Sequence, residues 1–437
     1  MTARLLRISR AATLVTLVVM AWQVSLPLAL PQFDTARLPL PYLAPAVPLA
    51  EITALIAINA YALAGWPNRD VIYTGWRRVF ALTMLGLILF AALSITWSLH
   101  QGLAAIQVLH VAIWAAFTLL IACADWSPAS MTSALLSGVL LHSIVGFIQI
   151  GLRPVVAITP QNSGISVVFN GTEHWQRVYG LSPHPNLLGG HLAVSAILTV
   201  GLILTQQRRK RFLLSMAWLI IWFTLLLTFS RSAWLAVIGG SVVAMAFLIR
   251  GRHLTRSLSK PLMILSGLGM MAIVIFGVWF QPFLANRLDV RTIPYEMQAI
   301  TGRLNSARLA LQIFTAHPVT GVGLAQSIVA LRDQFGTAID WIHNVPLLIA
   351  AELGGVGIVL SGSLLMALLA MGARRWQTRT IALGQALIGG ALGALLIVMQ
   401  FDHYAWTTAQ GGLLWAWLVG WWLRAETSRR CDHATES

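Results

Sequence analysis

The sequence predicts an all-α polytopic membrane protein with about twelve transmembrane helices and both termini on the cytoplasmic side. Of its 437 residues, 57% are hydrophobic and only 10% are charged, whereas an average soluble domain carries about 25% charged residues. The apolar residues fall into blocks of about 17 to 25, the length that a helix needs to cross a bilayer. A helix also satisfies its own backbone hydrogen bonds, which lipid cannot do, so these blocks are expected to be helices.

The apolar blocks are expected to form a single membrane domain that takes in residues 1–437. The expected spans are 11–30, 44–65, 79–98, 103–123, 131–152, 182–205, 213–229, 232–249, 261–281, 346–371, 380–400 and 406–423. The first span follows three arginines and is too long for the apolar part of a cleaved signal peptide, so we expect a retained signal anchor. Cys123 and Cys431 both fall on the expected cytoplasmic side and predict neither a disulfide nor a metal site.

Clusters of basic residues orient these spans. With twelve spans, one side of the membrane receives Arg77–Arg78, Arg208–Arg211, Arg250–Lys260, Arg374–Arg379 and Arg424–Arg430. The positive-inside rule makes that side cytoplasmic, and residues 424–437 become a cytoplasmic tail. The largest extramembrane element is then an outer loop over 282–345.

The outer loop over 282–345 carries signals of helices and is expected to be a folded cap. Thr301 can cap a helix that has apolar residues at helical spacing, and His317-Pro318 is expected to end it. A second helix is expected over 325–335.

Nine arginines and no lysine fall on the expected outer side. They are Arg37, Arg153, Arg177, Arg231, Arg287, Arg291, Arg303, Arg308 and Arg332. Four of them are expected to be solvated surface, namely Arg37, Arg287, Arg291 and Arg332. Exclusive use of arginine favours recognition of an oxyanion such as phosphate, which the planar guanidinium binds with two hydrogen bonds.

Arg231 stands out among these arginines, because it lies between two apolar spans with almost no loop between them. A charge at such a depth usually faces a cavity or a partner, and the alternative is a side chain that extends to the lipid headgroups. The outer carboxylates are scattered: Asp34, Glu173, Asp289, Glu296, Asp333, Asp340 and Asp402. None forms the Asp-x-Asp pair that holds a divalent ion beside a diphosphate, so phosphate chemistry assisted by arginine, without a metal, is expected.

A set of motifs follows in order along the second half of the chain. They are Arg177-x-x-Gly180 with Pro185-Asn186, Ser230-Arg231, Gly302-Arg303, Gly321-x-Gly323, His343-Asn344 followed after nine residues by Gly354-x-x-Gly357, and Phe401-Asp402-His403-Tyr404. In this order, and with a large outer loop before the histidine, the set resembles the O-antigen ligase family. The resemblance covers about residues 177–420, whereas the first five spans carry nothing diagnostic.

The resemblance implies a membrane glycosyltransferase of GT-C-like fold, with its active site on the periplasmic face of a bacterial inner membrane. Such an enzyme moves a polysaccharide from undecaprenyl diphosphate to a sugar hydroxyl of lipid A–core, with inversion and without a metal. The implied partners are this lipid-linked donor, the lipid A–core acceptor and membrane lipids. Neither a cofactor nor a nucleic acid is expected.

The resemblance and the residue chemistry together assign roles. His343 is expected to be the base or to position the acceptor, since neutral histidine accepts a proton near pH 7. A diphosphate clamp is expected from Arg177, Arg231 and Arg303. Expected supporting residues are Asn186, Arg308, Asp340, Asn344 and Asp402.

Helical geometry gives expectations for four further residues of these motifs and their surroundings. Asp340, three residues before His343, can share a helix face with it and orient the ring, although a solvated loop carboxylate is as good an interpretation. Arg308 lies five residues, or about 140° of helix, from Arg303, so the two do not easily serve one phosphate. Gly354, with Gly357, is expected to serve close helix packing.

Other functions remain open at this stage. A polymerase of lipid-linked repeats, or a protein O-glycosyltransferase, of the same superfamily would share the donor chemistry and differ in the acceptor. An anion or lipid transporter, with arginines along its path, would favour helices broken at mid-membrane and repeated halves, and the sequence predicts neither.

Overall fold

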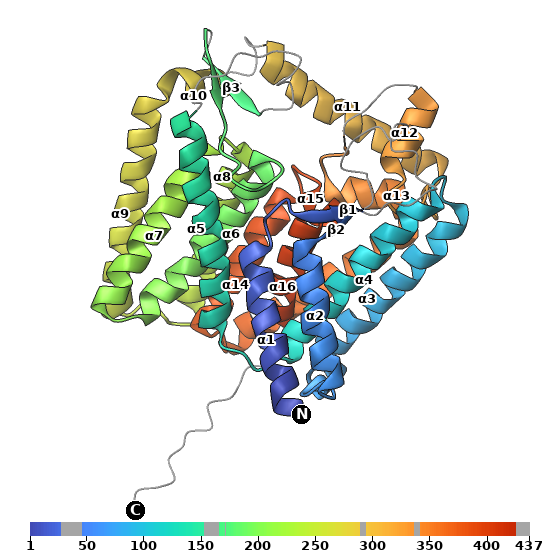
Figure 1. Cartoon of the computed structure of the whole chain (residues 1–437), viewed down its shortest axis with the longest axis horizontal. Coiled ribbons are helices and arrows are strands. Elements are labelled where there is room, and N and C mark those ends of the chain that lie inside the picture. The colour runs from blue at the N-terminus through green and yellow to red at the C-terminus, as the bar shows by residue number, and fades with distance from the viewer. Residues whose placement is uncertain (28–45, 153–165, 171, 289–293, 336–340, 425–437) are drawn as a thin grey trace, which may run out of the picture.

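The computed structural model describes residues 1–27, 46–152, 166–170, 172–288, 294–335 and 341–424. These residues form a bundle of long helices that run roughly side by side (Figure 1). One end of the bundle carries α10, α11, α12 and the hairpin of β3 and β4, and we call it the loop end. The N-terminus lies at the opposite end.

Each of the twelve expected spans overlaps one helix. These are α1 (Thr2–Val19), α2 (Leu49–Leu63), α3 (Gly75–Ser94), α4 (Gln101–Cys123), α5 (Pro128–Leu152), α6 (Pro185–Thr205), α7 (Arg208–Leu227), α8 (Arg231–Arg250), α9 (Arg256–Trp279), α13 (Val345–Thr378), α14 (Leu383–Val398) and α16 (Ala409–Leu423). Within the described residues, eight helices are long and apolar enough to cross a bilayer, as expected of a polytopic membrane protein, and α2 and α14 are shorter apolar helices. The count of twelve spans and the cytoplasmic termini stay predictions.

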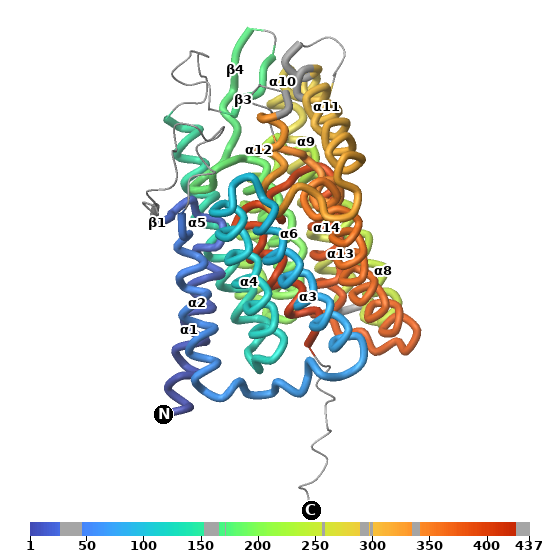
Figure 2. The backbone as a smooth tube through the Cα atoms, turned by 90° about the vertical axis from the view of Figure 1, so that its right-hand side faces the viewer, coloured from blue at the N-terminus to red at the C-terminus, as the bar shows by residue number. Residues whose placement is uncertain are grey.

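Shorter elements join these helices. They are β1 (Ser25–Pro27) and β2 (Ala46–Pro48), η3 (Arg69–Tyr73), η4 (Ile95–Trp97), β3 (Val167–Phe169) and β4 (His174–Gln176), α10 (Gln281–Leu288), α11 (Pro294–Ala316), α12 (Ser327–Phe335) and α15 (Tyr404–Thr407). β1 pairs with β2, and β3 with β4, each antiparallel. In Figure 2, α11 lies over the end of the bundle where α13 begins.

Two helix boundaries differ from the prediction. The first helix runs over Thr2–Val19 rather than 11–30, because its arginines are exposed and do not have to leave the helix to reach water. In the outer loop, α11 begins at Pro294, where proline suits the first turn, so Thr301 lies inside the helix and does not cap it. The expected end at His317-Pro318 and the expected second helix agree with the structure.

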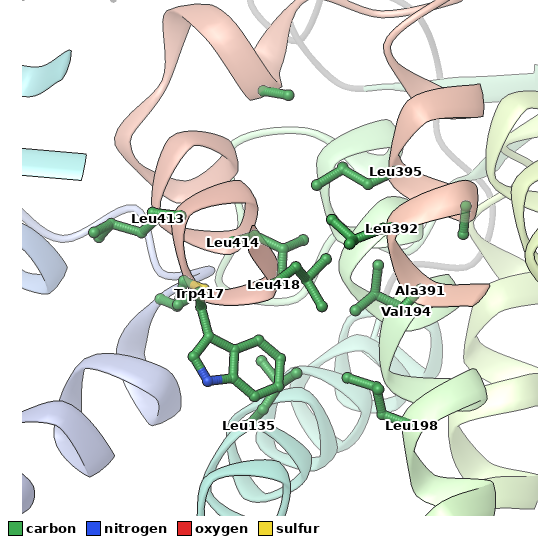
Figure 3. Packing of buried hydrophobic residues seen from close by; sticks show 14 of the residues in the cluster. Leu135, Val194, Leu198, Ala391, Leu392, Leu395, Leu413, Leu414, Trp417 and Leu418 are labelled. Carbon is green, nitrogen blue, oxygen red and sulfur yellow. The ribbon is translucent and has the colours of Figure 1, made fainter. Parts of the chain in front are cut away.

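The core of the bundle lies around α6, which is buried along almost its whole length. A helix that is apolar on all sides is stable only when neighbours surround it, and α5, α7, α8 and α14 pack against α6. Figure 3 shows buried residues of α5, α6, α14 and α16 packed together: Leu135, Val194, Leu198, Ala391, Leu392, Leu395, Leu413, Leu414, Trp417 and Leu418. Small residues bring helices close: a Cβ on Gly240 of α8 would overlap the carbonyl oxygen of Gly390 of α14. Such close contact is what holds helices together in lipid.

Helix α13 is broken near its beginning, at Gly354, whose φ of 61° and ψ of −156° are not helical. The break leaves backbone groups that bond to the preceding loop. Val322 N donates to Ala351 O over 3.1 Å, and Gly355 N donates to Pro318 O over 2.8 Å. A Cβ on Gly354 would overlap the backbone of that loop, so this glycine serves loop packing rather than the predicted helix packing. The loop is thereby fixed to the start of α13, close to residues 341–344.

Candidate functional site

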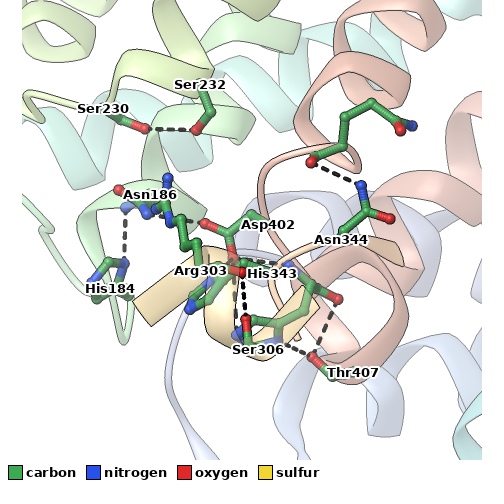
Figure 4. Close-up of polar contacts among 12 residues, drawn as sticks. His184, Asn186, Ser230, Ser232, Arg303, Ser306, His343, Asn344, Asp402 and Thr407 are labelled. Carbon is green, nitrogen blue, oxygen red and sulfur yellow. Dashed lines mark hydrogen bonds and ion pairs between the residues drawn. The ribbon is translucent and has the colours of Figure 1, made fainter. Parts of the chain in front are cut away.

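His343 and Asp402 meet at the loop end, although the chain separates them widely. His343 lies in a bend directly before α13, and Asp402 lies in the turn between α14 and α15. The Nδ1 atom of His343 is 3.5 Å from Oδ1 of Asp402, within ion-pairing distance (Figure 4). Asp402 is only 4% exposed, whereas His343 keeps part of its surface open. A buried carboxylate thus supports an accessible imidazole.

Asn344 fixes the segment that carries His343. Its Oδ1 accepts a hydrogen bond from Leu347 N over 2.9 Å, which caps α13, and its Nδ2 donates to Gln400 O over 3.0 Å. Val345 N also donates to Met399 O over 2.8 Å. These bonds tie the start of α13 to the end of α14, two residues before Asp402. Asn344 therefore ties together the two segments that carry His343 and Asp402.

Asn186 connects the same carboxylate to Arg177. Asn186 Nδ2 donates to Asp402 Oδ2 over 3.0 Å, and Arg177 Nη2 donates to Asn186 Oδ1 over 2.6 Å. The Nε atom of Arg177 donates to Thr228 O over 2.7 Å. Arg177 is 6% exposed and Asn186 is 8% exposed. A buried chain of polar contacts therefore runs from Arg177 through Asn186 and Asp402 to His343.

The surroundings of Asp402 stabilise its ionised form. Burial raises the pKa of the Asp402 carboxyl, but the contact with His343, and the charge of the His403, His343 and His184 rings whenever they are protonated, together hold this pKa well below its usual range. Asp402 is therefore a carboxylate at every physiological pH. It can stabilise a positive charge that forms on a neighbouring imidazole.

Arg303 approaches the site from the outer loop. It lies on α11, is partly exposed, and stands beside His343 and Asp402 in Figure 4. Arg308 lies on the same regular helix and is exposed. The predicted separation of Arg303 and Arg308 around the helix agrees with this difference in exposure.

Arg231 begins α8 and donates from Nη1 to Arg287 O over 3.0 Å. The guanidinium thus reaches the backbone of α10, which belongs to the outer loop. Arg287 itself is 9% exposed, so its expected place on a solvated surface was wrong. The reason is that α10 packs against β3, and Arg287 lies one helical turn after the buried Phe283, on the same face of α10. Arg177 reaches the turn between α7 and α8, directly before Arg231, through its bond to Thr228 O.

The carboxylate beside His343 is Asp402, one of the expected supporting residues. Asp340, which was considered either as a residue that orients the ring or as a solvated loop carboxylate, lies outside the described residues. Residues 341–343 are not helical, so a helix face shared with Asp340 does not exist at the histidine. Glu352 lies two residues before the break in α13 and is only 1% exposed. It accepts hydrogen bonds from Ser327 Oγ over 2.8 Å and from Trp406 Nε1 over 3.1 Å. Glu352 supports the loop end and does not contact His343 directly.

His403 also belongs to the site, and the sequence gave no role to it beyond its place beside Asp402. Within the described part of the chain, the ligand-type atoms of His343, Asp402 and His403 lie within 4.8 Å of one another, so these residues could hold a metal ion. Both oxygens of Asp402 also accept hydrogen bonds, Oδ1 from His403 N over 2.9 Å and Oδ2 from Asn186. The same arrangement is suited to a proton-accepting imidazole beside a carboxylate.

Comparison with known proteins adds one positive finding. The family model described as O-antigen ligase matches residues 215–362. This range contains Arg231, Arg303 and His343, whereas Arg177 and Asp402 reach the same site from outside it. A search of curated proteins finds no match. Residues 215–362 carry an O-antigen ligase domain, and this match supports the assignment of the chain to the O-antigen ligase family.

Proposed function

We propose that this protein is a glycosyltransferase that moves a polysaccharide from undecaprenyl diphosphate to a sugar hydroxyl of lipid A–core, at the periplasmic face of a bacterial inner membrane. The family supports ligase or polymerase chemistry on lipid-linked sugars. The single observation that carries the proposal is the contact of His343 with the buried carboxylate of Asp402, 3.5 Å away, at the end of the bundle where Arg303 also lies.

In the proposed reaction, His343 accepts the proton of the acceptor hydroxyl as its oxygen attacks the anomeric carbon of the donor sugar. The new carbon–oxygen bond forms as the bond from the anomeric carbon to the diphosphate breaks, so undecaprenyl diphosphate leaves and the configuration inverts. The proton resides on His343, and Asp402 stabilises the imidazolium without taking the proton. Its low pKa suits that role, because a strongly acidic carboxyl does not compete for the proton.

The leaving diphosphate gains negative charge as the bond breaks, and fixed cations at that place lower the barrier. We assign this role to Arg231 and Arg303, and to the charge of Arg177. In the structure, Arg177 donates to Asn186 and Thr228, so its contribution includes holding Asn186 against Asp402. The three arginines come from the hairpin before α6, from α8 and from α11. We propose that they supply the charge that a metal ion supplies in other diphosphate enzymes, and that the reaction is metal-independent.

The acceptor distinguishes the proposed function from the two alternative functions within the same superfamily. A polymerase would use a second lipid-linked repeat, and a protein O-glycosyltransferase would use a hydroxyl of a protein. A transporter would use the break in α13 as part of a path, but the backbone groups at this break bond to residues 318–323. The Asp402–His343 contact and Arg303 lie together at the loop end, which favours a reaction site at one end of the bundle over a path through it.

The test uses the purified full chain in lipid nanodiscs with undecaprenyl-diphosphate-linked polysaccharide as donor. Lipid A–core, a second donor molecule and a protein carrying serine hydroxyls are offered as acceptors, and products are identified by mass spectrometry. We expect transfer to lipid A–core, its loss in His343→Gln, and normal transfer in His317→Gln, an exposed histidine at the end of α11. Product on another acceptor would reassign the function within the superfamily. Undiminished transfer by His343→Gln would refute the role of His343.

A further inference from the structure

The ring of His403 is enclosed by two other rings of the site. It stacks on Trp341 with centroids 5.0 Å apart and an interplanar angle of 18°. It meets His343 edge-on, with centroids 5.2 Å apart and an angle of 65°. Trp341 and His343 are two residues apart in the irregular segment before α13, and both of their rings contact the ring of His403. His403 therefore forms part of the wall against which His343 is held.

The two ring nitrogens of His403 face different partners. Nδ1 lies 2.6 Å from Oγ1 of Thr407, and Nε2 lies 3.9 Å from Oδ1 of Asp402. When the Thr407 hydroxyl donates to Nδ1, neutral His403 carries its proton on Nε2, toward the carboxylate. The backbone N–H of His403 donates to the same Oδ1 over 2.9 Å. One carboxylate oxygen thus lies between two imidazoles, at 3.5 Å from His343 and 3.9 Å from His403.

We propose that His403 is a positioning residue of the transfer reaction, which holds the ring of His343 in place and shares the negative charge of Asp402 with it. This inference rests on the proposed function, because that function gives His343 the task of accepting the proton. His403 itself has no assigned contact with the donor or the acceptor. It acts through His343 and Asp402.

Sharing the carboxylate has a chemical consequence. A carboxylate beside an imidazole favours its protonated form, and a second imidazole on the same oxygen weakens this effect. His403 therefore keeps His343 neutral, and able to accept a proton, to lower pH than Asp402 alone would allow. Other charged groups also surround the two rings and Asp402: His184, before α6; Arg177, which reaches Asp402 through Asn186; and Arg303 of α11, which stands beside His343 and Asp402 in Figure 4.

The first test compares His403→Phe with the parent enzyme. Phenylalanine keeps an aromatic ring against Trp341 but removes both nitrogens. We expect kcat to fall about tenfold while the KM values of donor and acceptor stay within about twofold. The acid limb of the pH–rate profile should move to higher pH by about 0.5 to 1 unit. Without a second imidazole on the same oxygen, Asp402 stabilises the protonated form of His343 more strongly. The matched control is His317→Phe, an exposed histidine at the end of α11, which should leave both readouts unchanged.

A second variant and a second readout keep the inference testable. Thr407→Val is close in volume and removes only the hydroxyl that fixes the ring of His403, so we expect a smaller shift in the same direction. Independently of activity, carbethoxylation of His343 by diethylpyrocarbonate, followed by peptide mass spectrometry, reports the fraction of neutral ring at each pH. Its midpoint should rise in His403→Phe and in Thr407→Val, and stay unchanged in His317→Phe.

These readouts separate two kinds of failure. If the parent transfers sugar to no acceptor, the proposed function fails, while the carbethoxylation midpoints still test the coupling of the two rings. If the parent is active and His403→Phe folds, with unchanged kcat, acid limb and midpoint, the inference about His403 is overturned. If His403→Phe does not fold, Thr407→Val decides: an unchanged midpoint in that variant overturns the inference.

Discussion

Asn186 and Asp402, which are 216 residues apart in sequence, bond side chain to side chain over 3.0 Å. This contact joins the start of α6 to the turn between α14 and α15, so the buried helix at the centre of the bundle also carries one support of the site. Asn186 engages the oxygen of Asp402 that does not face His343. Asn186 therefore orients the carboxylate through Oδ2, while Oδ1 lies next to His343.

The first prediction concerns Asn186→Leu, which keeps the approximate size but removes both polar contacts. Arg177 and Asp402 would each lose a buried partner, at a cost of about 1–3 kcal/mol for each group left unsatisfied. We expect the melting temperature of the purified protein to fall by several degrees and the transfer rate to fall about tenfold or more, measured by thermal unfolding in detergent and by product formation. Asn59→Leu is the control, because Asn59 is exposed on α2 and bonds only within its own helix. Equal stability of the two variants would contradict a structural role of Asn186.

Replacement of Asp402 by Asn tests the electrostatics of the site. The folded-state pKa of Asp402 is depressed, so its contribution to stability is present above its ordinary value of about 3.9 and is lost only as the pH falls through the folded value. Between pH 5 and 8 its charge is constant, and the acid limb of the rate profile belongs to an imidazole. Removing a negative charge 3.5 Å from His343 disfavours the protonated ring, so the acid limb of Asp402→Asn should move to lower pH by about one unit.

The direction of that shift is the informative part, since it is opposite to the one expected of His403→Phe. A rate profile whose acid limb moves to higher pH in Asp402→Asn would contradict the assignment of Asp402 as the carboxylate that stabilises the base. The measurement is kcat/KM for the lipid-linked donor from pH 5 to 9. Thermal unfolding at the same pH values separates loss of activity from loss of fold.

Arg231→Lys tests whether the site needs a planar guanidinium or only a positive charge. Arg231 donates to Arg287 O over 3.0 Å, and lysine, a compact point charge, cannot keep this bond and also bind a diphosphate with two parallel hydrogen bonds. We expect the KM for the donor to rise about tenfold or more. Arg308→Lys, on an exposed face of α11, should behave like the parent. If the KM of Arg231→Lys for the donor equals that of the parent, Arg231 does not bind the diphosphate, and the alternative holds, in which its side chain extends to the lipid headgroups.

Much of the helical framework could be predicted because the bilayer imposes a length and a composition on each span, and both are visible in the sequence. The ends of the helices were harder to predict, because polar residues can lie either inside a helix or in the loop before it. The exposed arginines of the N-terminus belong to α1, and α11 begins at Pro294, before Thr301. Gly354 was recognised as special, but its positive φ depends on a loop that returns to α13, which no local pattern reveals.

The site residues also divide into those that the sequence reveals and those that only the fold brings together. His343 and the arginines stand out because charged or ionisable residues are rare in this chain and follow a family pattern. The partner of His343 could not be chosen from sequence, since Asp340 is near along the chain, whereas Asp402 is brought near only by the packing of α14 on α6 and by Asn344. His403 could have been inferred from its place beside Asp402, but its contact with Trp341 depends on the irregular stretch before α13, which no local pattern predicts.

Removal of divalent ions tests the proposal that arginines alone stabilise the leaving diphosphate. We expect the transfer rate to be unchanged in excess chelator, with metal content of the purified protein followed by mass spectrometry. His343, Asp402 and His403 are the described residues at which a bound ion would act, because their ligand atoms lie within 4.8 Å of one another. Loss of activity that returns on addition of one divalent ion, and does not return in His403→Phe, would replace the proposed mechanism with a metal-assisted one.

The last prediction concerns the break in α13. Gly354→Ala would place a Cβ where the backbone of Val319 and Gly321 lies, at a φ of 61° that disfavours residues with a side chain. The strain costs about 1–3 kcal/mol, to which the overlap adds. Because residues 318–323 bond to the break, we expect them to shift, and the transfer rate to fall together with the melting temperature. Gly362→Ala, on the same helix with open space around its Cα, should be neutral or stabilise the helix by about 0.5–1 kcal/mol. If both variants behaved alike, the break would have no part in holding the loop against the site, and the position of His343 would depend on Asn344 alone.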